Sequence, residues 1–354
     1  MKTRLANEYS LLGLGMALML CLGACGQKGA EVPEPLHTTD GEILCVADPC
    51  VYECDGVYYL TASAEAEGGF CYYTSRDLMT WEPKGMLFRV PEDNPVKTML
   101  WASEVAEHEG VYYLTYSGWD DRAQALNIQL ATSTSPDGPF EILYSPWIAL
   151  EGRNAIDANL FWDRDGSAYV YFSENGHFDG FSGAILGMAR LGENMSFSTD
   201  SLLDVSSERQ EWEMHMKNPT DYCNEGPEVF RSGDTYFMLY SANETHNGYY
   251  GMGVMTAPTP LGPWVKDEAN PFMQTNFEVG TTEFGIPLIS SPGHCGVVPA
   301  RTADGTPTSR TAEGVQSGHI LYHRHAPWVK EYPSNDRVTC IAAFEIRDGK
   351  FAIR

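Results

Sequence analysis

The sequence predicts an all-β protein folded as a five-bladed β-propeller, and three observations support this prediction. A pattern of strand, tight turn and strand recurs along the chain, each copy is followed by a second stretch suited to a strand pair, and no long amphipathic helix interrupts the series. A recurring unit of this kind indicates a repeat architecture. A β-sandwich is the alternative all-β fold, but it does not require one element to recur five times.

The repeated hairpin is clearest in its first two copies. Residues 51–61 (VYECDGVYYLT) and 105–115 (VAEHEGVYYLT) place two apolar or aromatic runs around an acidic residue followed by glycine. Such a turn between two runs of strand-forming residues is a strong hairpin signal. Related hairpins lie at 160–171 and 229–240, and a fainter fifth copy joins 296–298 to 319–323.

The stretch after each hairpin suits an outer pair of strands. Clear examples run from 71–75 to 79–81, from 128–132 to 138–140 and from 252–256 to 262–264. Four strands per unit are typical of a propeller blade. Consecutive units begin 53 to 69 residues apart when their first residues are taken as Asp48, Trp101, Asp157, Glu225 and His294.

The N-terminus has the pattern of an export signal. Lys2 and Arg4 precede an apolar run at 11–22, which is shorter than the roughly 20 residues of a transmembrane helix and closes on small residues, as a signal peptide does. Cys25 resembles the lipidated cysteine of a bacterial lipoprotein signal. We therefore expect a signal peptide at 1–24, a lipid-anchored linker at 25–40 and the propeller domain at 41–354.

These features predict an exported protein attached through Cys25 to a bacterial membrane, with the outer membrane or cell surface as its expected location. The formal net charge of −25 argues against nucleic-acid binding, because a polyanion would be repelled.

Seven cysteines remain after the two in the signal region, so at least one is unpaired. No second Cys or His pair follows Cys50 and Cys54 at zinc-finger spacing, and we expect buried free thiols instead.

Three acidic residues stand at the starts of three repeats. Asp48 precedes a proline, Asp157 follows an isoleucine, and Glu225 precedes Gly-Pro. First strands of propeller blades converge at the axis, so these carboxylates are expected to meet in one pocket. Inverting hydrolysis of a glycosidic bond needs a carboxylate that deprotonates water and a protonated carboxyl that protonates the leaving oxygen. A third carboxylate raises the pKa of the acid by charge repulsion.

Five short motifs at these starts resemble the successive blade motifs of glycoside hydrolase family 43, in the same order. They are 47–49 (ADP), 101–104 (WASE), 156–158 (IDA), 225–227 (EGP) and 292–294 (PGH), and the resemblance covers residues 42–345. The resemblance implies a five-bladed propeller and an inverting mechanism without a covalent intermediate. It further implies that Asp48 is the general base, Asp157 the pKa modulator and Glu225 the general acid.

The resemblance also suggests residues that contact substrate. Trp101 is either core or a stacking surface for a sugar ring, and Ser103, where the family usually has proline, could shift the loop that carries Glu104. No cofactor is required, and the one metal that the resemblance admits is a calcium–water cluster at His294. The candidate substrate-binding residues are Trp101, Glu104, Asn154, Ile156 and His294.

The expected substrate is a plant cell-wall polysaccharide or oligosaccharide that contains arabinose or xylose. An α-L-arabinofuranosidase is the leading prediction, because Arg153-Asn154 resembles arabinan-active members. A β-xylosidase, an endo-arabinanase or a galactan-active enzyme with the same acids is the alternative, and a non-catalytic sugar-binding lipoprotein is the alternative class. A retaining fructan-cutting propeller would start with Asn-Asp-Pro, whereas this chain has Ala47-Asp48-Pro49.

Overall fold

The computed structural model describes residues 32–63, 68–178, 181–205, 208–300 and 315–354. These residues form one compact body, Val32–Arg354. It consists of β-strands and three short 3₁₀ helices, η1 (Glu193–Met195), η2 (Thr199–Ser201) and η3 (Glu211–Glu213). Within the described residues, no helix is long and apolar enough to cross a membrane.

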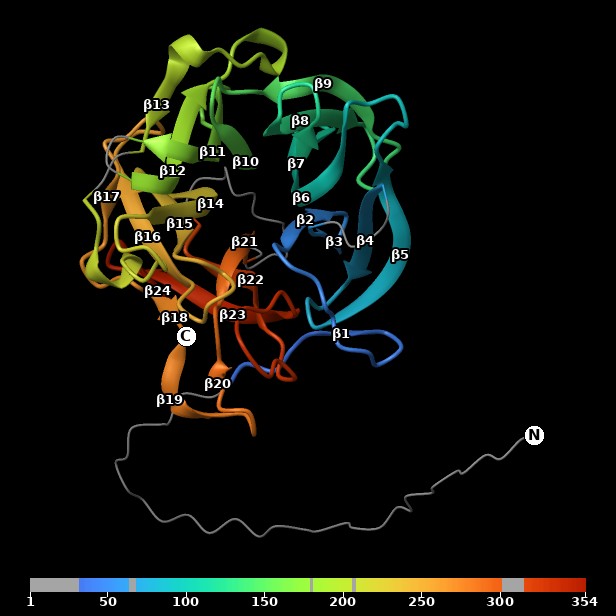
Figure 1. The fold of residues 1–354 in the computed structure, drawn as a ribbon. Helices are drawn as coiled ribbons and strands as arrows, with labels where there is room; N and C mark the ends of the chain where they lie inside the picture. The colour runs from blue at the N-terminus through green and yellow to red at the C-terminus, as the bar shows by residue number, and fades with distance from the viewer. Residues whose placement is uncertain (1–31, 64–67, 179–180, 206–207, 301–314) are drawn as a thin grey trace. The chain divides into compact units, whose positions relative to one another are not determined.

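Five antiparallel blades surround a common axis, along which Figure 1 is viewed. Blade 1 comprises β2 (Cys50–Cys54), β3 (Val57–Thr61), β4 (Gly69–Ser75) and β5 (Thr80–Arg89). Blade 2 comprises β6 (Val96–His108), β7 (Val111–Asp120), β8 (Ala125–Ser133) and β9 (Glu141–Ile148). Blade 3 comprises β10 (Asn154–Trp162), β11 (Ala168–Phe178), β12 (Phe181–Arg190) and β13 (Leu202–Asp204).

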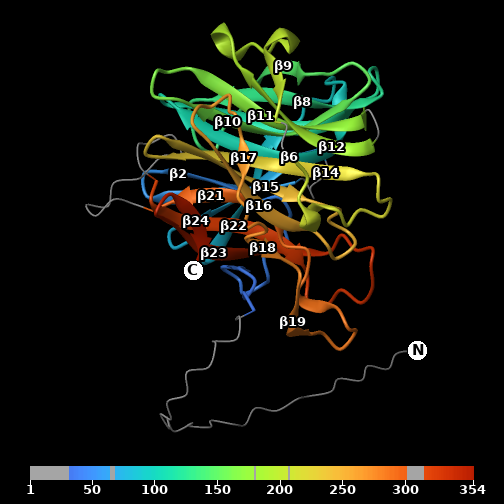
Figure 2. The ribbon, with the colours of Figure 1, turned by 90° about the vertical axis from the view of Figure 1, so that its left-hand side faces the viewer.

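Blade 4 comprises β14 (Tyr222–Ser232), β15 (Thr235–Ala242), β16 (Gly251–Ala257) and β17 (Val265–Lys266), with β18 (Met273–Gln274) also paired to β16. Blade 5 comprises β21 (Gly293–Pro299), β22 (Ser317–His325), β23 (Arg337–Arg347) and β24 (Lys350–Ile353). The hairpin of β19 (Asn276–Thr281) and β20 (Pro287–Ile289) lies between blades 4 and 5 and projects from the body in Figures 1 and 2. All five predicted hairpins are confirmed by strand pairing, and the chain is a five-bladed β-propeller.

Consecutive apolar residues of an inner strand face the two different blades on either side of it. In blade 1, Val51 packs toward blade 5 and Tyr52 toward blade 2. In blade 4, Val229 packs toward blade 3 and Phe230 toward blade 5. Side chains alternate between the two faces of a strand, and both faces of a blade are covered. The apolar pairs in the repeats therefore supply five hydrophobic clusters, one at each interface between blades.

An N-terminal segment closes the ring between blades 5 and 1. Strand β1 (His37–Thr38) pairs in parallel with β5, while the Leu36 N–H donates to the Thr339 carbonyl in β23 at 2.8 Å. Leu36 and Leu44 are each 1% exposed within the cluster at this interface. Residues 32–40 therefore belong to the folded body, which corrects the predicted linker boundary at residue 40. The predicted signal peptide and Cys25 lie outside the described residues.

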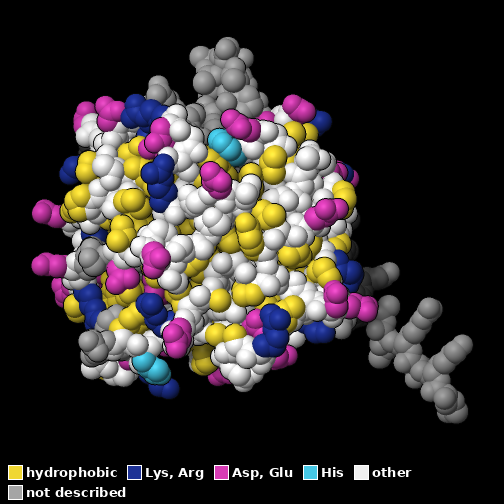
Figure 3. Space-filling model, turned by 90° about the horizontal axis from the view of Figure 1, so that it is seen from above, with side chains coloured by type: hydrophobic (Ala, Val, Ile, Leu, Met, Phe, Trp, Pro, Cys, Tyr) yellow, Lys and Arg dark blue, Asp and Glu magenta, His cyan; other side chains and the backbone are white. Residues whose placement is uncertain are grey.

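The cysteines agree with the sequence analysis, and the surface charges on one face of the molecule are mixed. The seven cysteines of the body are free thiols, of which Cys50, Cys223, Cys295 and Cys340 are buried. On the side of the molecule shown in Figure 3, Lys and Arg side chains are interspersed with Asp and Glu rather than gathered into a stripe.

Candidate active site

Each inner strand carries one residue in the left-handed backbone conformation near the axis, either within the strand or, in blade 1, just before it. In four blades the pairing register shifts at this point, and such a bulge re-aims the side chains that follow it. Left-handed residues other than glycine are uncommon and cluster at functional sites. The five residues are Asp48 (φ 56°), Ala102 (φ 42°), Asp157 (φ 58°), Gly226 (φ 58°) and His294 (φ 45°).

A ring of hydrogen bonds between blades fixes these five residues. In each case the backbone N–H of the left-handed residue donates to a side chain of the preceding blade. This side chain lies in the second strand of that blade or just after the strand. The pairs are Ala102 to Ser63 Oγ (2.8 Å), Asp157 to Ser117 Oγ (3.0 Å), Gly226 to Ser173 Oγ (3.3 Å), His294 to Ser241 Oγ (2.8 Å) and Asp48 to His323 Nδ1 (3.1 Å). We name this set the axial ring. Its acceptors escaped the sequence analysis, although a serine recurs at this point of four copies.

The residues two positions further along the inner strands form a second layer beneath the axial ring. Glu104 lies in this layer, 8% exposed, and accepts a hydrogen bond from Asn159 Nδ2 at 2.9 Å. Asn159 Nδ2 also donates to Glu228 Oε2 at 2.6 Å, and the Val105 N–H donates to the Cys50 thiol at 3.3 Å. Glu104 therefore has a structural partner, and its predicted contact with substrate stays a prediction.

Asp48 is half-buried and faces two histidines. Its Oδ1 lies 3.1 Å from His323 Nδ1 and 3.4 Å from His294 Nδ1, while Oδ2 accepts a hydrogen bond from Ser63 Oγ. Burial raises the pKa of Asp48, but the nearby imidazoles of His294 and His323 outweigh it and hold this pKa well below its usual range. Asp48 is therefore an ionised carboxylate.

The pKa values of the two histidines are shifted in opposite directions. Burial lowers the pKa of His294, but four carboxylates, of which Asp48 is the strongest, reverse this and raise it above its ordinary value. Burial lowers the pKa of His323 to about 4, which leaves it neutral. The acidic side chains thus favour the protonated form of His294.

Asp157 and Glu225 lie on neighbouring blades and repel each other. Asp157 is 4% exposed and accepts a hydrogen bond from Ser173 Oγ at 3.3 Å. Burial, together with the negative charges of Glu225 and Asp48, raises the pKa of Asp157 to about 7 despite the opposing charge of His294. Asp157 therefore retains its proton up to about neutral pH.

Two side chains hold the carboxylate of Glu225, which is half-buried. Tyr250 OH donates to Oε1 at 2.7 Å, and the Cys223 thiol lies 3.5 Å from Oε2. Tyr250 is 1% exposed and stacks on His323, which in turn contacts Asp48. The next residue, Gly226, packs against His294 so closely that a Cβ there would lie 3.1 Å from the ring. Neither Tyr250 nor Cys223 was predicted, because these contacts join residues without a shared sequence motif.

The other predicted substrate-binding residues divide into exposed and buried positions. Trp101 precedes Ala102 and is 38% exposed, so its ring is accessible. Asn154 accepts a hydrogen bond from the Leu126 N–H at 2.9 Å, and Ile156 is 7% exposed beside Asp157. The structure therefore brings Trp101, Asp48, Asp157, Glu225 and His294 to one end of the axis, and their contacts with substrate stay predictions.

A metal site has little support from side chains. Among the described residues, no group of three or more His, Cys, Asp or Glu side chains is arranged to hold a metal ion. His294 Nδ1 faces Asp48 and carries a raised pKa, so this nitrogen does not fit a metal ligand. A calcium ion at His294 stays an untested prediction, and the reaction proposed below does not use one.

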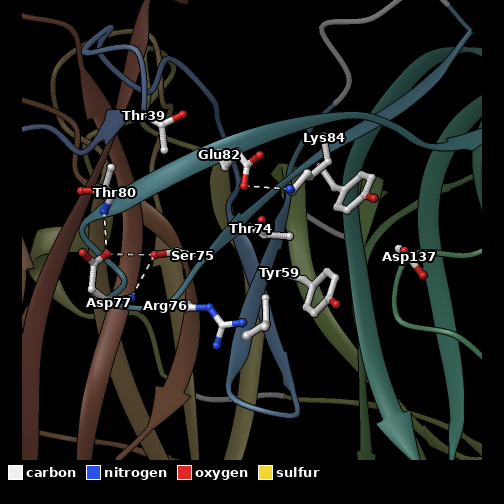
Figure 4. Close-up of a pocket in the computed structure, with 12 residues that line it drawn as sticks. Thr39, Tyr59, Thr74, Ser75, Arg76, Asp77, Thr80, Glu82, Lys84 and Asp137 are labelled. Carbon is white, nitrogen blue, oxygen red and sulfur yellow. Dashed lines mark hydrogen bonds and ion pairs between the residues drawn. The ribbon is translucent and has the colours of Figure 1, made fainter.

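A groove of about 500 Å³ lies at the opposite end of blade 1, between its outer strands and Asp137 of blade 2 (Figure 4). Val57 and Tyr59 line it from the start of β3, at the far end of the hairpin from Asp48. Lys84 and Glu82 form an ion pair of 2.7 Å at its edge. This groove is therefore separate from the axial ring.

Comparison with known proteins identifies the family of this chain. The family model for glycosyl hydrolases family 43 matches residues 44–351. A β-D-galactofuranosidase, xynD, from Aspergillus niger is 28% identical over 77% of this chain and 70% of its own length. An extracellular endo-α-(1→5)-L-arabinanase from Bacillus subtilis is 23% identical over 70% of this chain and 57% of its own length.

Solved structures give the same result. A thermostable family-43 glycoside hydrolase superposes with a TM-score of 0.77 and 28% identity, covering 92% of this chain and 96% of that chain. An endo-1,4-β-xylanase from Bacteroides thetaiotaomicron gives a TM-score of 0.70 and 29% identity, and the match covers 88% of this chain and 94% of that chain. The chain belongs to glycoside hydrolase family 43 and is an inverting glycoside hydrolase.

Proposed function

We propose that this protein hydrolyses arabinose- or xylose-containing plant polysaccharides or their oligosaccharides, and most specifically that it is an α-L-arabinofuranosidase. In this proposal Asp48 is the general base, Glu225 the general acid and Asp157 the residue that keeps the acid protonated. One observation carries it: three carboxyl groups from three blades lie around His294, and the pKa of Asp48 is held low while that of Asp157 is raised to about 7.

The reaction is a single displacement. Asp48 takes a proton from a water molecule as the water oxygen attacks the anomeric carbon. The bond between that carbon and the leaving oxygen breaks, and Glu225 donates its proton to this oxygen. Bond formation opposite the leaving group inverts the anomeric configuration. Both carboxyl groups then return to their starting protonation states by exchange with solvent.

The surroundings of the two groups support this division of roles. Asp48 accepts hydrogen bonds and faces positive charge, which favours the ionised form that a base requires. Glu225 lies in a partly buried position beside Asp157, whose pKa is raised to about 7. Two carboxyl groups with separated proton affinities are the usual sign of an acid and base pair.

The choice of sugar rests on relatives and on the Arg153-Asn154 pair. An exo-α-(1→5)-L-arabinofuranosidase of Cellvibrio japonicus is 23% identical over 64% of this chain. The match to a β-D-galactofuranosidase favours a second candidate, because β-D-galactofuranose and α-L-arabinofuranose share their ring configuration and differ in the exocyclic carbon. A β-xylosidase is the remaining candidate, and the non-catalytic sugar-binding alternative is set aside because the chain is a hydrolase family member.

Release of sugar from a panel of substrates tests the proposal. The full chain would be incubated with aryl α-L-arabinofuranoside, aryl β-D-xyloside and aryl β-D-galactofuranoside, and with arabinan, arabinoxylan and β-galactan. We expect the arabinofuranoside to be the best aryl substrate. Preference for either other aryl glycoside would replace the proposed sugar, and folded protein inactive on the whole panel would contradict the proposed substrate class.

We also propose that the protein is exported and anchored by a lipid on Cys25. The proposal rests on the apolar run at 11–22 and on the small residues before Cys25. Metabolic labelling with a palmitate analogue in a bacterial host tests it. Label should appear in the intact protein and be lost in Cys25→Ser, whereas Cys21→Ser should keep it. Equal labelling of intact protein and Cys25→Ser would overturn the anchor.

A further inference from the structure

A stacked pair of rings stands beside the proposed acid. Tyr249 and His215 stack with centroids 4.9 Å apart and planes 15° from parallel, and Tyr249 is 47% exposed. The neighbour of Tyr249 in the chain is Tyr250, whose hydroxyl holds Glu225 Oε1. The exposed pair is therefore attached directly to the residue that positions the proposed acid.

Asn243 joins this pair to the inner strand of blade 4. Its side chain accepts a hydrogen bond from the His215 N–H at 2.9 Å and donates to the Tyr249 carbonyl at 3.1 Å. Its own N–H donates to the Cys223 carbonyl, two residues before Glu225. Asn243 is 1% exposed and left-handed, with φ 73°. Both rings are thus fixed relative to the strand that carries the acid.

The loop that carries His215 is held by a buried ion pair. Glu213 in η3 is fully buried and contacts Lys266 Nζ at 2.7 Å, and Tyr240 OH also donates to Glu213 at 2.8 Å. Breaking such a pair leaves an uncompensated buried charge, so the loop has one strongly preferred position. A surface fixed before binding loses little conformational freedom when a ligand arrives.

A polar groove of about 540 Å³ begins at His215 and leads outward over blade 4. Its exposed side chains are carboxylates and amides, which hydrogen-bond sugar hydroxyl groups. Its two exposed carboxylates, Glu211 and Glu268, disfavour an acidic chain. The groove is lined by Gln210, Glu211, Trp212, His215, Glu268, Asn270 and Gln274.

We infer that Tyr249, His215 and this groove form a binding site for the neutral oligosaccharide on the leaving-group side of the scissile bond. This inference rests on the function proposed above, because the group that protonates the leaving oxygen must face the leaving sugar. The ring pair supplies a flat surface for one sugar, and the groove receives the sugars beyond it.

The test compares substrates with and without a leaving-group sugar. The full chain would be assayed on the glycosyl fluoride of the sugar identified by the panel, and on oligosaccharides of two to five units that end in that sugar. For Tyr249→Ala we expect kcat/KM on the longer oligosaccharides to fall about tenfold, mostly through KM, as loss of an aromatic contact predicts. The value on the fluoride should stay unchanged, and Tyr249→Phe should behave as the unaltered protein.

A matched control lies at the other end of the propeller. His108 stacks on Trp162 with centroids 4.7 Å apart and planes 10° from parallel, so His108→Ala removes a similar ring contact far from Glu225. It should leave the dependence on chain length unchanged. Equal losses on fluoride and oligosaccharide for Tyr249→Ala, or no loss on either, would overturn the inference. Failure of the unaltered protein to hydrolyse either substrate would instead overturn the proposed function.

Discussion

At the scale of single residues, the protonation states around His294 set the pH range of activity. Asp48 is ionised across the working range because its pKa lies well below the usual value. The pKa of Asp157, which lies beside the proposed acid, is raised to about 7. Activity should therefore fall on the alkaline side as pH rises through about 7, when the site loses the proton that the leaving group requires.

Replacement of Asp157 by Asn tests this coupling. The substitution removes one negative charge beside Glu225, so the remaining carboxyl group should lose its proton at lower pH. We expect the alkaline limb of the kcat/KM profile to move to lower pH, with activity retained below it. An alkaline limb that stays in place or moves to higher pH would show that Asp157 does not act through the charge of the acid.

Replacement of Asp48 by Asn removes the proposed base. Activity on natural substrates should fall roughly 10²–10⁴-fold, while the melting temperature measured by circular dichroism stays near that of the unaltered protein. Asp137→Asn, in the groove at the far end of blade 1, is the control and should keep full activity. Wild-type turnover by Asp48→Asn would assign the base to another residue.

The sequence predicted the catalytic candidates but few of their partners. Asp48, Asp157 and Glu225 were found because each begins a repeat. Tyr250 was not, because its contact with Glu225 depends on two strands that meet only in the folded blade. Burial of Glu104 against Asn159 also depends on neighbouring blades, which no local pattern records.

At the scale of elements, the axial ring explains how every blade presents one residue to the site. The N–H of each left-handed residue needs an acceptor, and the preceding blade supplies it. The hairpins themselves were predictable, because turn chemistry and apolar alternation are local. The ring was not, since it joins residues on different blades.

Loss of one acceptor in the ring should destabilise the fold. Ser241→Ala leaves the buried N–H of His294 without its 2.8 Å partner, and an unsatisfied buried donor costs about 1–3 kcal/mol. Urea unfolding should show a loss of this size in the free energy of unfolding. Ser196→Ala, at an exposed serine, is the control and should change it by less than about 0.5 kcal/mol. Equal effects of the two substitutions would contradict a structural role for the ring.

At the scale of the whole molecule, residues 36–46 hold the first and last blades together. Sequence analysis placed part of this segment in a linker, because it follows the predicted lipid anchor and has the composition of a tether (EVPEP at 31–35). Its burial becomes visible only when the ring closes against β5 and β23.

Truncation of Leu36 tests this closure. Leu36 is 1% exposed in the cluster between blades 5 and 1, and replacement of a buried Leu by Ala costs roughly 2–5 kcal/mol. Leu36→Ala should lower the free energy of unfolding by an amount in this range. Leu203→Ala, at a position that is 46% exposed, should have a small effect. A similar small effect for Leu36→Ala would mean that the segment does not close the ring.

The measurement that tests the central claim most directly is the dependence of Glu225→Gln on the leaving group. The variant would be assayed on a natural oligosaccharide and on the glycosyl fluoride of the same sugar, whose departure needs little protonation. We predict a loss of roughly 10²–10⁴-fold on the oligosaccharide and near-normal turnover of the fluoride. Equal losses on both substrates, or full activity on the oligosaccharide, would contradict the assignment of Glu225 as the general acid.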